Sequence, residues 1–460
     1  MNNVVRTPLL LMAGVEAIIL YSSLYVAGIV AFGNLTNCES SIGPLAPKAV
    51  ALSGVTLVSM IAMGLYQFHE RMRFHEAAMR VVAGVVAGTA CIGAIYYALP
   101  ASLVTREVAG IAIVYSMLLL LLVRYYFVRT VDRNIFRRRT LIYGAGERAA
   151  SIADLRRRAD RRGFQIVGKI APENDHVVGG DNVIAMHGRS ISDIADQTEA
   201  DEIVVAMDDR RGKLPIRDLL DARLRGIEVI DLLEFLERET GKIRVDLVNP
   251  GWLIFSSGFR TSRFRRLAKR LLDLVVSTIL LVFAWPVILL IALAIKLEDG
   301  FRAPVFYRQQ RVGRADKPFT VLKFRSMTEN AESDGKAVWA EADDKRITKV
   351  GRWLRVSRLD ELPQVLNVFR GHMSLVGPRP ERPEFVDGLK DRIPYYSERH
   401  TVPPGLTGWA QLKYGYGASE EDAIEKLQYD LYYVKNHSLI LDLLIILQTV
   451  EVVLWGKGAR

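Results

Sequence analysis

Two adjacent carboxylates, Asp360 and Glu361, stand in the stretch RVSRLDELPQVLNV, residues 355–368. Carboxylates suit three chemical tasks: general base, nucleophile, or ligand of a divalent cation. An adjacent pair also occurs where the start of a helix simply attracts negative charge, because the helix dipole is positive there. The pair alone leaves these alternatives open, so its surroundings must decide among them.

Basic residues flank the pair on both sides along the sequence. They are Lys323, Arg325, Arg355, Arg358 and Arg379. Such cations can merely balance charge, but lysine and arginine also bind phosphate. A sugar hydroxyl as acceptor would need a base, whereas a phosphate acceptor is already ionised. With a phosphate acceptor, one carboxylate could attack phosphorus and the other could hold Mg2+ against a diphosphate.

The residues after the pair predict a helix. Its apolar face would consist of Leu362, Val365, Leu366 and Phe369, which follow i, i+3, i+4, i+7 spacing. Gly371 supplies a stop, and Pro363 is tolerated only near a helix start. We therefore expect Asp360 and Glu361 in the first turn of this helix, where its dipole favours charged carboxylates and attracts phosphate.

Basic residues are also dense in PVFYRQQRVGRADKPFTVLKFRSM, residues 304–327. This stretch predicts two strands around a turn that contains glycine and proline. Downstream, GPRPERPEF holds Arg379 on a turn stiffened by prolines. These ordered elements could position cations around a phosphate.

The elements before this unit indicate a membrane protein. Four apolar runs, 8–32, 48–67, 80–99 and 107–128, are each long enough to cross a bilayer as a helix. The first connection lacks Lys and Arg, whereas the second connection and the segment after the last run are rich in Arg. By the positive-inside rule, both ends of the bundle face the cytoplasm.

A fifth apolar run, residues 271–297, has basic residues on both flanks. A straight span would break the charge rule on one side. Pro286, preceded by Trp285, lies mid-run, where it removes a helix hydrogen bond and favours a kink. We expect a re-entrant helix that bends at Trp285 and Pro286 and returns to the cytoplasmic face. The alternative is a fifth full span.

Between these membrane parts, residues 139–250 alternate short apolar runs with polar helical stretches, which predicts a parallel α/β sheet of Rossmann type. Gly144, Gly146 and Ala149 resemble a dinucleotide fingerprint at a strand-to-helix turn. However, no clear acidic residue ends a second strand at the expected distance. We favour a structural or regulatory domain over real dinucleotide binding.

Bulk composition agrees with a membrane protein that has an anionic partner. Half of the 460 residues are hydrophobic and the net charge is +10, which suits a phospholipid surface, a phosphorylated substrate or nucleic acid. Only Cys38 and Cys91 are present, and their positions give no reason to pair them. A disulfide framework and a thiolate metal site are excluded.

From residue 269 to 460 the chain strongly resembles the bacterial sugar transferases, the monotopic polyprenyl-phosphate phosphoglycosyl transferases. The matching pieces are KRLLDLVVS, YRQQRVGR, FTVLKFRSM, SRLDELPQVLNVFRGHMSLVGPRP, PGLTGWAQ and YDLYYVKNHSLILDLLIIL. The whole chain resembles the long-form members. The expected organisation is a four-span bundle (1–130), a Rossmann-like domain (139–250), a linker (251–268), and a re-entrant helix with an α/β catalytic domain (269–460).

The resemblance implies transfer of a sugar 1-phosphate from a UDP-sugar to undecaprenyl phosphate, with release of UMP, at the start of exopolysaccharide or O-antigen assembly. It implies that Asp360 is the nucleophile, forming a phosphosugar intermediate, and that Glu361 assists with Mg2+. Lys323, Arg355 and Arg379 match positions that hold phosphates or organise the site. Gln411 and Asp430 match positions near the nucleotide.

The resemblance also implies a bacterial inner-membrane protein whose catalytic domain faces the cytoplasm, and relatives of this length make a homodimer plausible. No nucleic-acid partner is expected. One departure concerns the hairpin bend, where the family commonly has Ser-Pro and this chain has Trp285 and Pro286. Two other functions stay open: a membrane-tethered dinucleotide-dependent sugar-modifying enzyme and a non-catalytic scaffold of glycan assembly.

Overall fold

A computed structural model describes residues 7–66, 74–98, 104–131, 137–153, 155, 163–172, 178, 182–209, 214–248, 250–256, 258–259, 262–328, 346–415, 417 and 419–455. The chain divides into two compact units, one ending at Gly241 and the other beginning at Lys242. The first unit contains a helix bundle and a sheet domain, and the second contains the Asp360–Glu361 pair. Each unit is described by itself.

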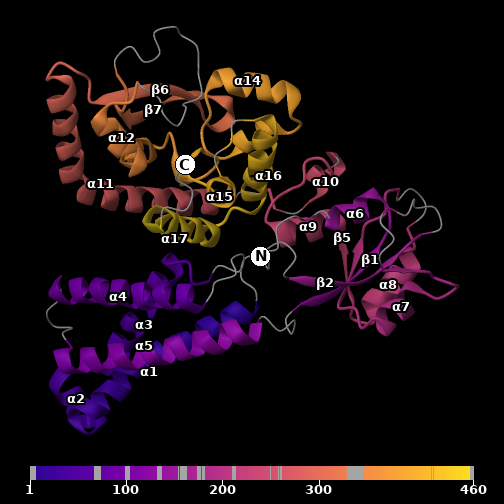
Figure 1. Ribbon diagram of the computed structural model, residues 1–460, viewed down its shortest axis with the longest axis horizontal. Helices are drawn as coiled ribbons and strands as arrows, with labels where there is room; N and C mark the ends of the chain where they lie inside the picture. Colours follow the sequence, from indigo (N-terminus) through magenta and orange to yellow (C-terminus); the bar gives the residue numbers. More distant parts are fainter. Residues whose placement is uncertain are drawn as a thin grey trace. The chain divides into compact units, whose positions relative to one another are not determined.

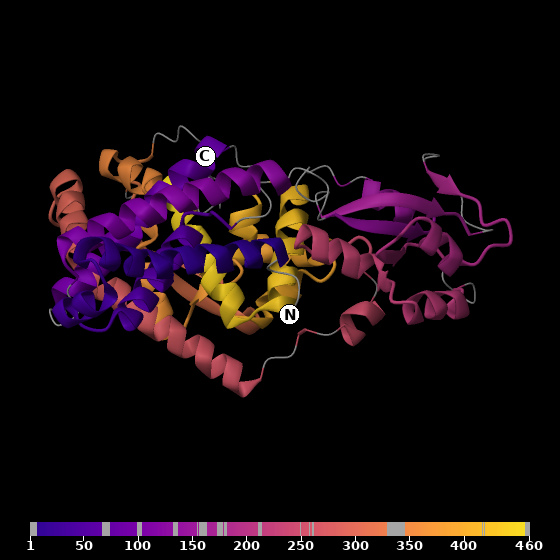
Figure 2. The ribbon, with the colours of Figure 1, turned by 90° about the horizontal axis from the view of Figure 1, so that it is seen from below.

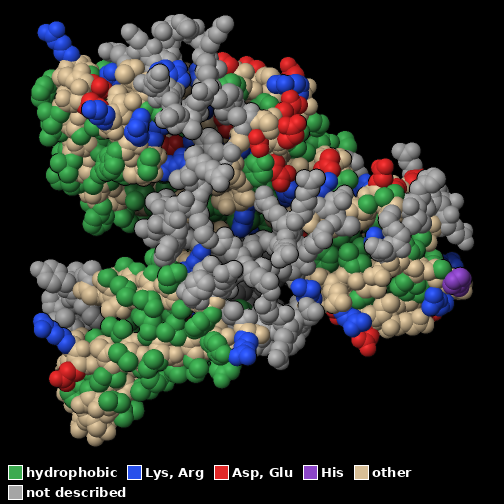
Figure 3. Space-filling model, in the orientation of Figure 1, with side chains coloured by type: hydrophobic (Ala, Val, Ile, Leu, Met, Phe, Trp, Pro, Cys, Tyr) green, Lys and Arg blue, Asp and Glu red, His purple; other side chains and the backbone are tan. Residues whose placement is uncertain are grey.

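The four predicted apolar runs of the first unit form helices, and one further short helix lies in the connection after the first of them (Figure 1). Among the described residues, α1, α3, α5 and the later helix α11 are long and apolar enough to cross a membrane, and α4 has a shorter apolar stretch. Hydrophobic side chains cover much of the bundle surface (Figure 3). The bundle helices are α1 (Thr7–Phe32), α2 (Leu35–Ile42), α3 (Leu45–Ala62), α4 (Phe74–Ala98) and α5 (Arg106–Val131).

A buried ion pair joins the first and last helices of the bundle. Glu16 of α1 and Arg124 of α5 are both buried, and their two contacts measure 2.7 and 3.0 Å. Tyr66 donates to the same carboxylate, and Arg124 donates to the Leu65 carbonyl at 2.8 Å. Removal of one partner would leave a buried charge uncompensated, so this pair fixes how the helices meet.

The sheet domain confirms the predicted parallel α/β arrangement. Five parallel strands lie in the order β3-β2-β1-β4-β5. Figure 2 shows the strands in one layer with helices of the same domain beneath them. The elements are β1 (Arg138–Tyr143), α6 (Glu147–Ala153), β2 (Phe164–Ile170), β3 (Val183–Ile184), α7 (Ile191–Gln197), β4 (Glu202–Val205), α8 (Ile216–Leu224), β5 (Glu228–Asp231) and α9 (Leu232–Thr240).

The second unit has a large hydrophobic core and a smaller separate cluster, packed between short strands and helices, and β6 and β7 form the predicted antiparallel hairpin. Its helices are α10 (Pro250–Phe255), α11 (Arg263–Asp299), α12 (Lys349–Val356), α13 (Gln364–Arg370), α14 (Pro383–Arg392), α15 (Trp409–Lys413), α16 (Glu420–Asn436) and α17 (Leu439–Trp455). Its strands are β6 (Phe306–Val312), β7 (Pro318–Phe324), β8 (Ser374–Val376) and β9 (Gly405–Thr407), and its 3-10 turns are η2 (Arg314–Asp316), η3 (Leu359–Glu361) and η4 (Tyr396–Thr401).

The boundary between the units lies earlier than residue 250. Ile243 is 2% exposed within the core of the second unit, and its N–H donates to the Gln428 carbonyl at 3.0 Å. Lys242 pairs with Glu425 on α16 at 2.5 Å. Residues 242–248 therefore belong to the second unit, because their side chains complete its core, and the sequence alone did not indicate this.

Helix α11 is 37 residues long and contains Pro286, and Figure 1 shows it in two legs that meet in a bend. Both legs attach to the second unit. In the first leg, Arg270 donates to the Val368 carbonyl at 2.7 Å, and Asp273 accepts from the Leu375 N–H at 3.0 Å. Such contacts fix the first leg against α13 and β8.

The second leg of α11 packs in a smaller hydrophobic cluster of the same unit. Ile291 and Ile295 are buried against Phe324 and Leu354, and Glu298 accepts the first N–H groups of α12. Between the two attachments the helix exposes apolar side chains, which include Val282, Phe283, Trp285, Leu289 and Leu290. Apolar exposure of this extent suits a lipid environment.

Candidate active site

Asp360 and Glu361 lie in the 3-10 turn η3, not in the first turn of the following helix as predicted. Helix α13 begins only at Gln364, since Pro363 is its N-cap. Its buried face also differs from the prediction: Val365 is buried, but Phe369 is 43% exposed. The sequence pattern correctly predicted helix α13 but placed its start too early and assigned part of its buried face wrongly.

Two local features set the direction of the carboxylates. Arg358, just before η3, has a left-handed backbone with φ of 59°, a conformation that costs a non-glycine residue about 1 kcal/mol. Asn367 of α13 is buried, and its side chain bonds to Leu322 N–H at 3.0 Å and to the Thr320 carbonyl at 2.7 Å. Strand β7, which carries Lys323, is thereby held beside the carboxylate turn.

Glu361 is held by two cations on one oxygen. Lys323 Nζ lies 3.3 Å and Arg379 Nη2 lies 2.7 Å from Glu361 Oε1. Burial alone would raise the pKa of Glu361, but the charges of Arg379 and Lys323 and their hydrogen bonds hold it well below its usual range. Glu361 is therefore an anion at any physiological pH.

Asp360 has the opposite environment. Burial, reinforced by the neighbouring charge of Glu361, raises the pKa of its carboxyl, although Lys323, Arg355 and Arg358 partly offset the rise. Within the described part of the chain, no hydrogen bond or ion pair engages the Asp360 carboxylate. A desolvated carboxylate without a partner is well suited to attack an electrophile.

The remaining predicted residues occupy different places. Arg325 is 9% exposed; its Nε donates to the Met327 carbonyl at 3.0 Å, and its Nη2 lies 3.7 Å from Asp299, at the end of α11. The contact with Asp299 joins the end of the hairpin to α11. Gln411 lies in α15, and its buried Oε1 has no hydrogen-bond partner among the residues the structure describes.

Asp430 is buried beneath the site and not exposed to it. It is 2% exposed and pairs with Arg399 at 2.7 Å. Arg399 in turn donates to the carbonyl of Arg379 at 2.9 Å. Sequence reasoning missed Arg399, because no periodicity or motif in its stretch, YYSERHTVPPG, distinguishes it from a surface arginine.

The carboxylate pair fits a magnesium ion that is shared with a substrate. No group of three or more His, Cys, Asp or Glu side chains forms a cation cage in the described ranges. Mg2+ commonly needs only one or two carboxylates when substrate phosphates supply further oxygens. Lys323 and Arg379 both contact Oε1 of Glu361. The other carboxylate oxygen of Glu361 is therefore the one that suits such an ion.

The glycine turn after β1 has a structural role in the sheet domain. A Cβ on Gly144 would lie 2.4 Å from the Ala206 carbonyl oxygen, so glycine is needed for close approach of β1 to β4. Asp208 accepts from the N–H groups of Glu147 and Arg148 at 3.0 and 2.8 Å. These amides at the start of α6 are the ones a pyrophosphate would use, so the geometry favours the structural interpretation of the fingerprint.

The sequence of this chain is similar to those of known proteins. The family model of the bacterial sugar transferases matches residues 264–456. A UDP-glucose:undecaprenyl-phosphate glucose-1-phosphate transferase from Klebsiella pneumoniae is 34% identical over 336 residues, which cover 70% of this chain and 69% of that protein. The chain belongs to the bacterial sugar transferase family.

Other bacterial sugar transferases match with different coverage. A UDP-N-acetylgalactosamine-undecaprenyl-phosphate N-acetylgalactosaminephosphotransferase from Aeromonas hydrophila is 41% identical over 53% of this chain and 56% of its own length. An undecaprenyl-phosphate glucose phosphotransferase from Komagataeibacter xylinus is 32% identical over 72% of this chain and 61% of its own length. The chain thus spans little more than half of these two relatives. The predicted family is confirmed.

Proposed function

We propose that this chain transfers a sugar 1-phosphate from a UDP-sugar to undecaprenyl phosphate, giving undecaprenyl-diphosphate-sugar and UMP. The observation that carries the proposal is a desolvated Asp360, without a hydrogen bond or ion pair to any described residue, beside a Glu361 that Lys323 and Arg379 hold as an anion. The activities for which the relatives from Klebsiella and Aeromonas are named support the same substrates.

The reaction would proceed in two displacements at phosphorus. An Asp360 oxygen attacks the phosphorus that carries the sugar, the bond from that phosphorus to UMP breaks, and UMP leaves with its electron pair. An ionised oxygen of undecaprenyl phosphate then attacks the aspartyl phosphosugar and releases the Asp360 carboxylate. Lys323, Arg355 and Arg379 would bind the phosphate oxygens. Since neither nucleophile carries a proton at neutral pH, no general base is needed.

A Mg2+ ion fits this proposal as a cofactor. Glu361 would hold it, with the diphosphate of the nucleotide sugar supplying further oxygens. When bound, the ion would neutralise charge on the diphosphate. Lys323 and Arg379 keep Glu361 ionised and oriented for that task, because both contact a single carboxylate oxygen.

The proposed location is the cytoplasmic face of the bacterial inner membrane, with α11 as a re-entrant helix. A straight helix of 37 residues would extend about 55 Å. Attachment of both legs of α11 to the same unit, at Asp273 and at Ile291, supports a helix that returns to the side from which it entered. Basic residues on both flanks support the cytoplasmic side.

The decisive test uses the purified full-length protein with Mg2+, undecaprenyl phosphate and a panel of UDP-sugars. We expect release of UMP with at least one sugar, and loss of that release by a factor of about 10³ or more in Asp360→Asn. Asp387→Asn, which alters an exposed carboxylate on α14, is the matched control and should retain full activity. Activity equal to wild type in Asp360→Asn would refute the covalent mechanism.

A further inference from the structure

We propose that Arg399, held by Asp430, is a positioning residue that fixes the main chain at Arg379 and so keeps the Arg379 guanidinium on Glu361. The inference rests on the proposed function for its catalytic consequence. It assigns Asp430 an indirect role, different from the nucleotide contact that the sequence resemblance implied.

The contacts of Arg399 form a continuous path to the site. Its Nε and Nη2 lie 3.0 and 2.7 Å from Asp430 Oδ2, and its Nη1 donates to the Tyr396 hydroxyl at 2.9 Å. Nη2 also donates to the Arg379 carbonyl at 2.9 Å. Arg379 then reaches Glu361 Oε1 at 2.7 Å.

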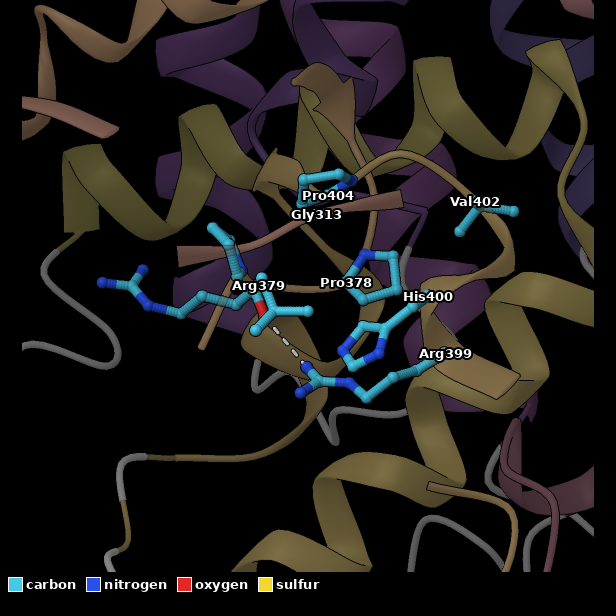
Figure 4. Close-up of a pocket in the computed structure, with 9 residues that line it drawn as sticks. Gly313, Pro378, Arg379, Arg399, His400, Val402 and Pro404 are labelled. Atoms are coloured by element: carbon cyan, nitrogen blue, oxygen red, sulfur yellow. Dashed lines mark hydrogen bonds between the residues drawn. The ribbon is translucent and has the colours of Figure 1, made fainter. Parts of the chain in front are cut away.

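Figure 4 shows the geometry of this path. Arg399 reaches the backbone oxygen of Arg379 from one side, while the Arg379 side chain extends the opposite way. Arg399 is 5% exposed and Asp430 is 2% exposed. Arg399 lines the small pocket of Figure 4 together with Arg379. Its guanidinium is already engaged by Asp430, Tyr396 and the Arg379 carbonyl, so we take its effect on chemistry to pass through Arg379.

The local sequence explains why the carbonyl of Arg379 needs a partner. Pro378 and Pro380 flank it and carry no N–H groups, so this turn is held largely by its carbonyls. Pro378 O accepts from Gly405 N–H at 2.9 Å, and Pro380 O accepts from Arg311 at 3.2 Å. Arg399 holds the carbonyl between them.

Charge also argues for a role beyond packing. Burying an arginine and an aspartate removes both from water, and an apolar pair of similar volume would often be at least as stable. An apolar residue at 399 could not, however, donate a charge-assisted hydrogen bond to the Arg379 carbonyl. Retaining the charged pair therefore maintains the position of Arg379.

The test uses the full-length protein with Arg399→Met, Arg399→Lys and Asp430→Asn, together with Arg379→Met and the double variant Arg379→Met/Arg399→Met. We expect Arg399→Met to lower kcat for UMP release at least tenfold while KM for the UDP-sugar changes less than threefold. Arg399→Lys should recover part of the loss. In the double variant, Arg399→Met should add almost nothing to the loss caused by Arg379→Met.

Arg392→Met is the matched control, because Arg392 makes an exposed ion pair with Glu420 at 2.8 Å between α14 and α16. It should leave kcat unchanged. Full additivity in the double variant, or wild-type kcat in Arg399→Met, would overturn the proposal. Asp430→Asn keeps the side-chain volume and the acceptor oxygen, so it tests the idea if Arg399→Met does not fold.

Hydrogen exchange of the peptide that contains residues 377–382 gives a readout independent of catalysis. Asp430→Asn and Arg399→Lys should raise its exchange rate, whereas Arg392→Met should not. If the native protein releases no UMP from any UDP-sugar, the proposed function fails but the exchange result still tests the position of Arg379. If native activity and its dependence on Asp360 hold and the exchange is unchanged, the positioning role alone fails.

Discussion

The pKa values of the two neighbouring carboxylates in η3 shift in opposite directions because their surroundings differ. Glu361 bonds to Lys323 and Arg379 and stays ionised, whereas Asp360 is desolvated and lies beside that fixed negative charge. The arrangement separates the roles of two groups that the sequence presents as equivalent. In the proposed function, Asp360 attacks phosphorus and Glu361 holds Mg2+.

The pH dependence of the first step should report this coupling. Because the pKa of Asp360 is raised above its ordinary value of 3.8, the burst of UMP release should be lost on acidification at a pH above that value. Glu361→Gln removes the like charge beside Asp360, which lowers the pKa of Asp360. The acidic limb of the pH–rate profile of the UMP burst should therefore move to lower pH, even though the maximal rate falls about tenfold or more.

Rapid-quench measurement of the UMP burst across pH, with UDP-sugar and no lipid acceptor, checks this prediction. Asp387→Asn is the control and should leave the limb in place. A limb that moves to higher pH in Glu361→Gln would contradict the proposed coupling.

At the scale of elements, α11 is the helix through which we propose that the catalytic unit meets the membrane. Its first leg is held through Arg270 and Asp273, its second through Ile291 and Glu298, and apolar side chains are exposed between them. Trp285 itself is 58% exposed, which suits a contact with lipid better than a contact with the core.

Single cysteines at the two ends of α11 can test its topology. In a Cys38→Ser/Cys91→Ser background, Phe264→Cys and Phe301→Cys replace side chains that are 77% and 74% exposed. Both should react with an impermeant maleimide in inverted vesicles and not in spheroplasts. Ser41→Cys, in the connection predicted to be external, should behave oppositely. Reaction of Phe301→Cys in spheroplasts alone would indicate a full span.

At the scale of the whole molecule, the chain consists of two units that meet at the Gly241–Lys242 bond. Each residue assigned to the active site lies between 323 and 430, within the second unit. The first unit contributes candidate membrane helices and a sheet domain whose glycine turn is occupied by the Asp208 carboxylate. The proposed active site and the proposed re-entrant helix thus both lie in the second unit.

Truncation should separate a required segment from a dispensable one. A chain that begins at 242 should release UMP within about threefold of the full-length rate, since it retains Ile243 and α11. A chain that begins at 264, where the family match starts, lacks Ile243, whose truncation to alanine alone should cost about 2–5 kcal/mol.

Melting temperature and UMP release of the two truncated proteins check this expectation. Ile243→Ala in the full chain should lower the melting temperature of the catalytic unit, and the exposed Ile216→Ala on α8 is the control. Equal stability and activity of the two truncated chains would show that residues 242–263 are dispensable.

The sequence by itself determined those features that depend on local patterns. Apolar runs predicted the bundle helices and α11. Short apolar runs that alternate with polar helical stretches predicted the parallel sheet, and a turn with glycine and proline predicted the β6–β7 hairpin. The motifs around Asp360 and along the rest of the second unit indicated the family. These helices and strands can be predicted because hydrophobic periodicity and turn residues act over a few neighbouring positions.

Only the tertiary structure decided which distant side chains meet. Residues 379, 399 and 430 form one hydrogen-bonded path, and Arg325 turned toward Asp299 although it lies two residues from Lys323 in the sequence. Asp208 closed the glycine turn from 60 residues away. Such partnerships arise when helices and strands pack, because burial then requires each polar group to find a partner, and no local pattern encodes which one it will be.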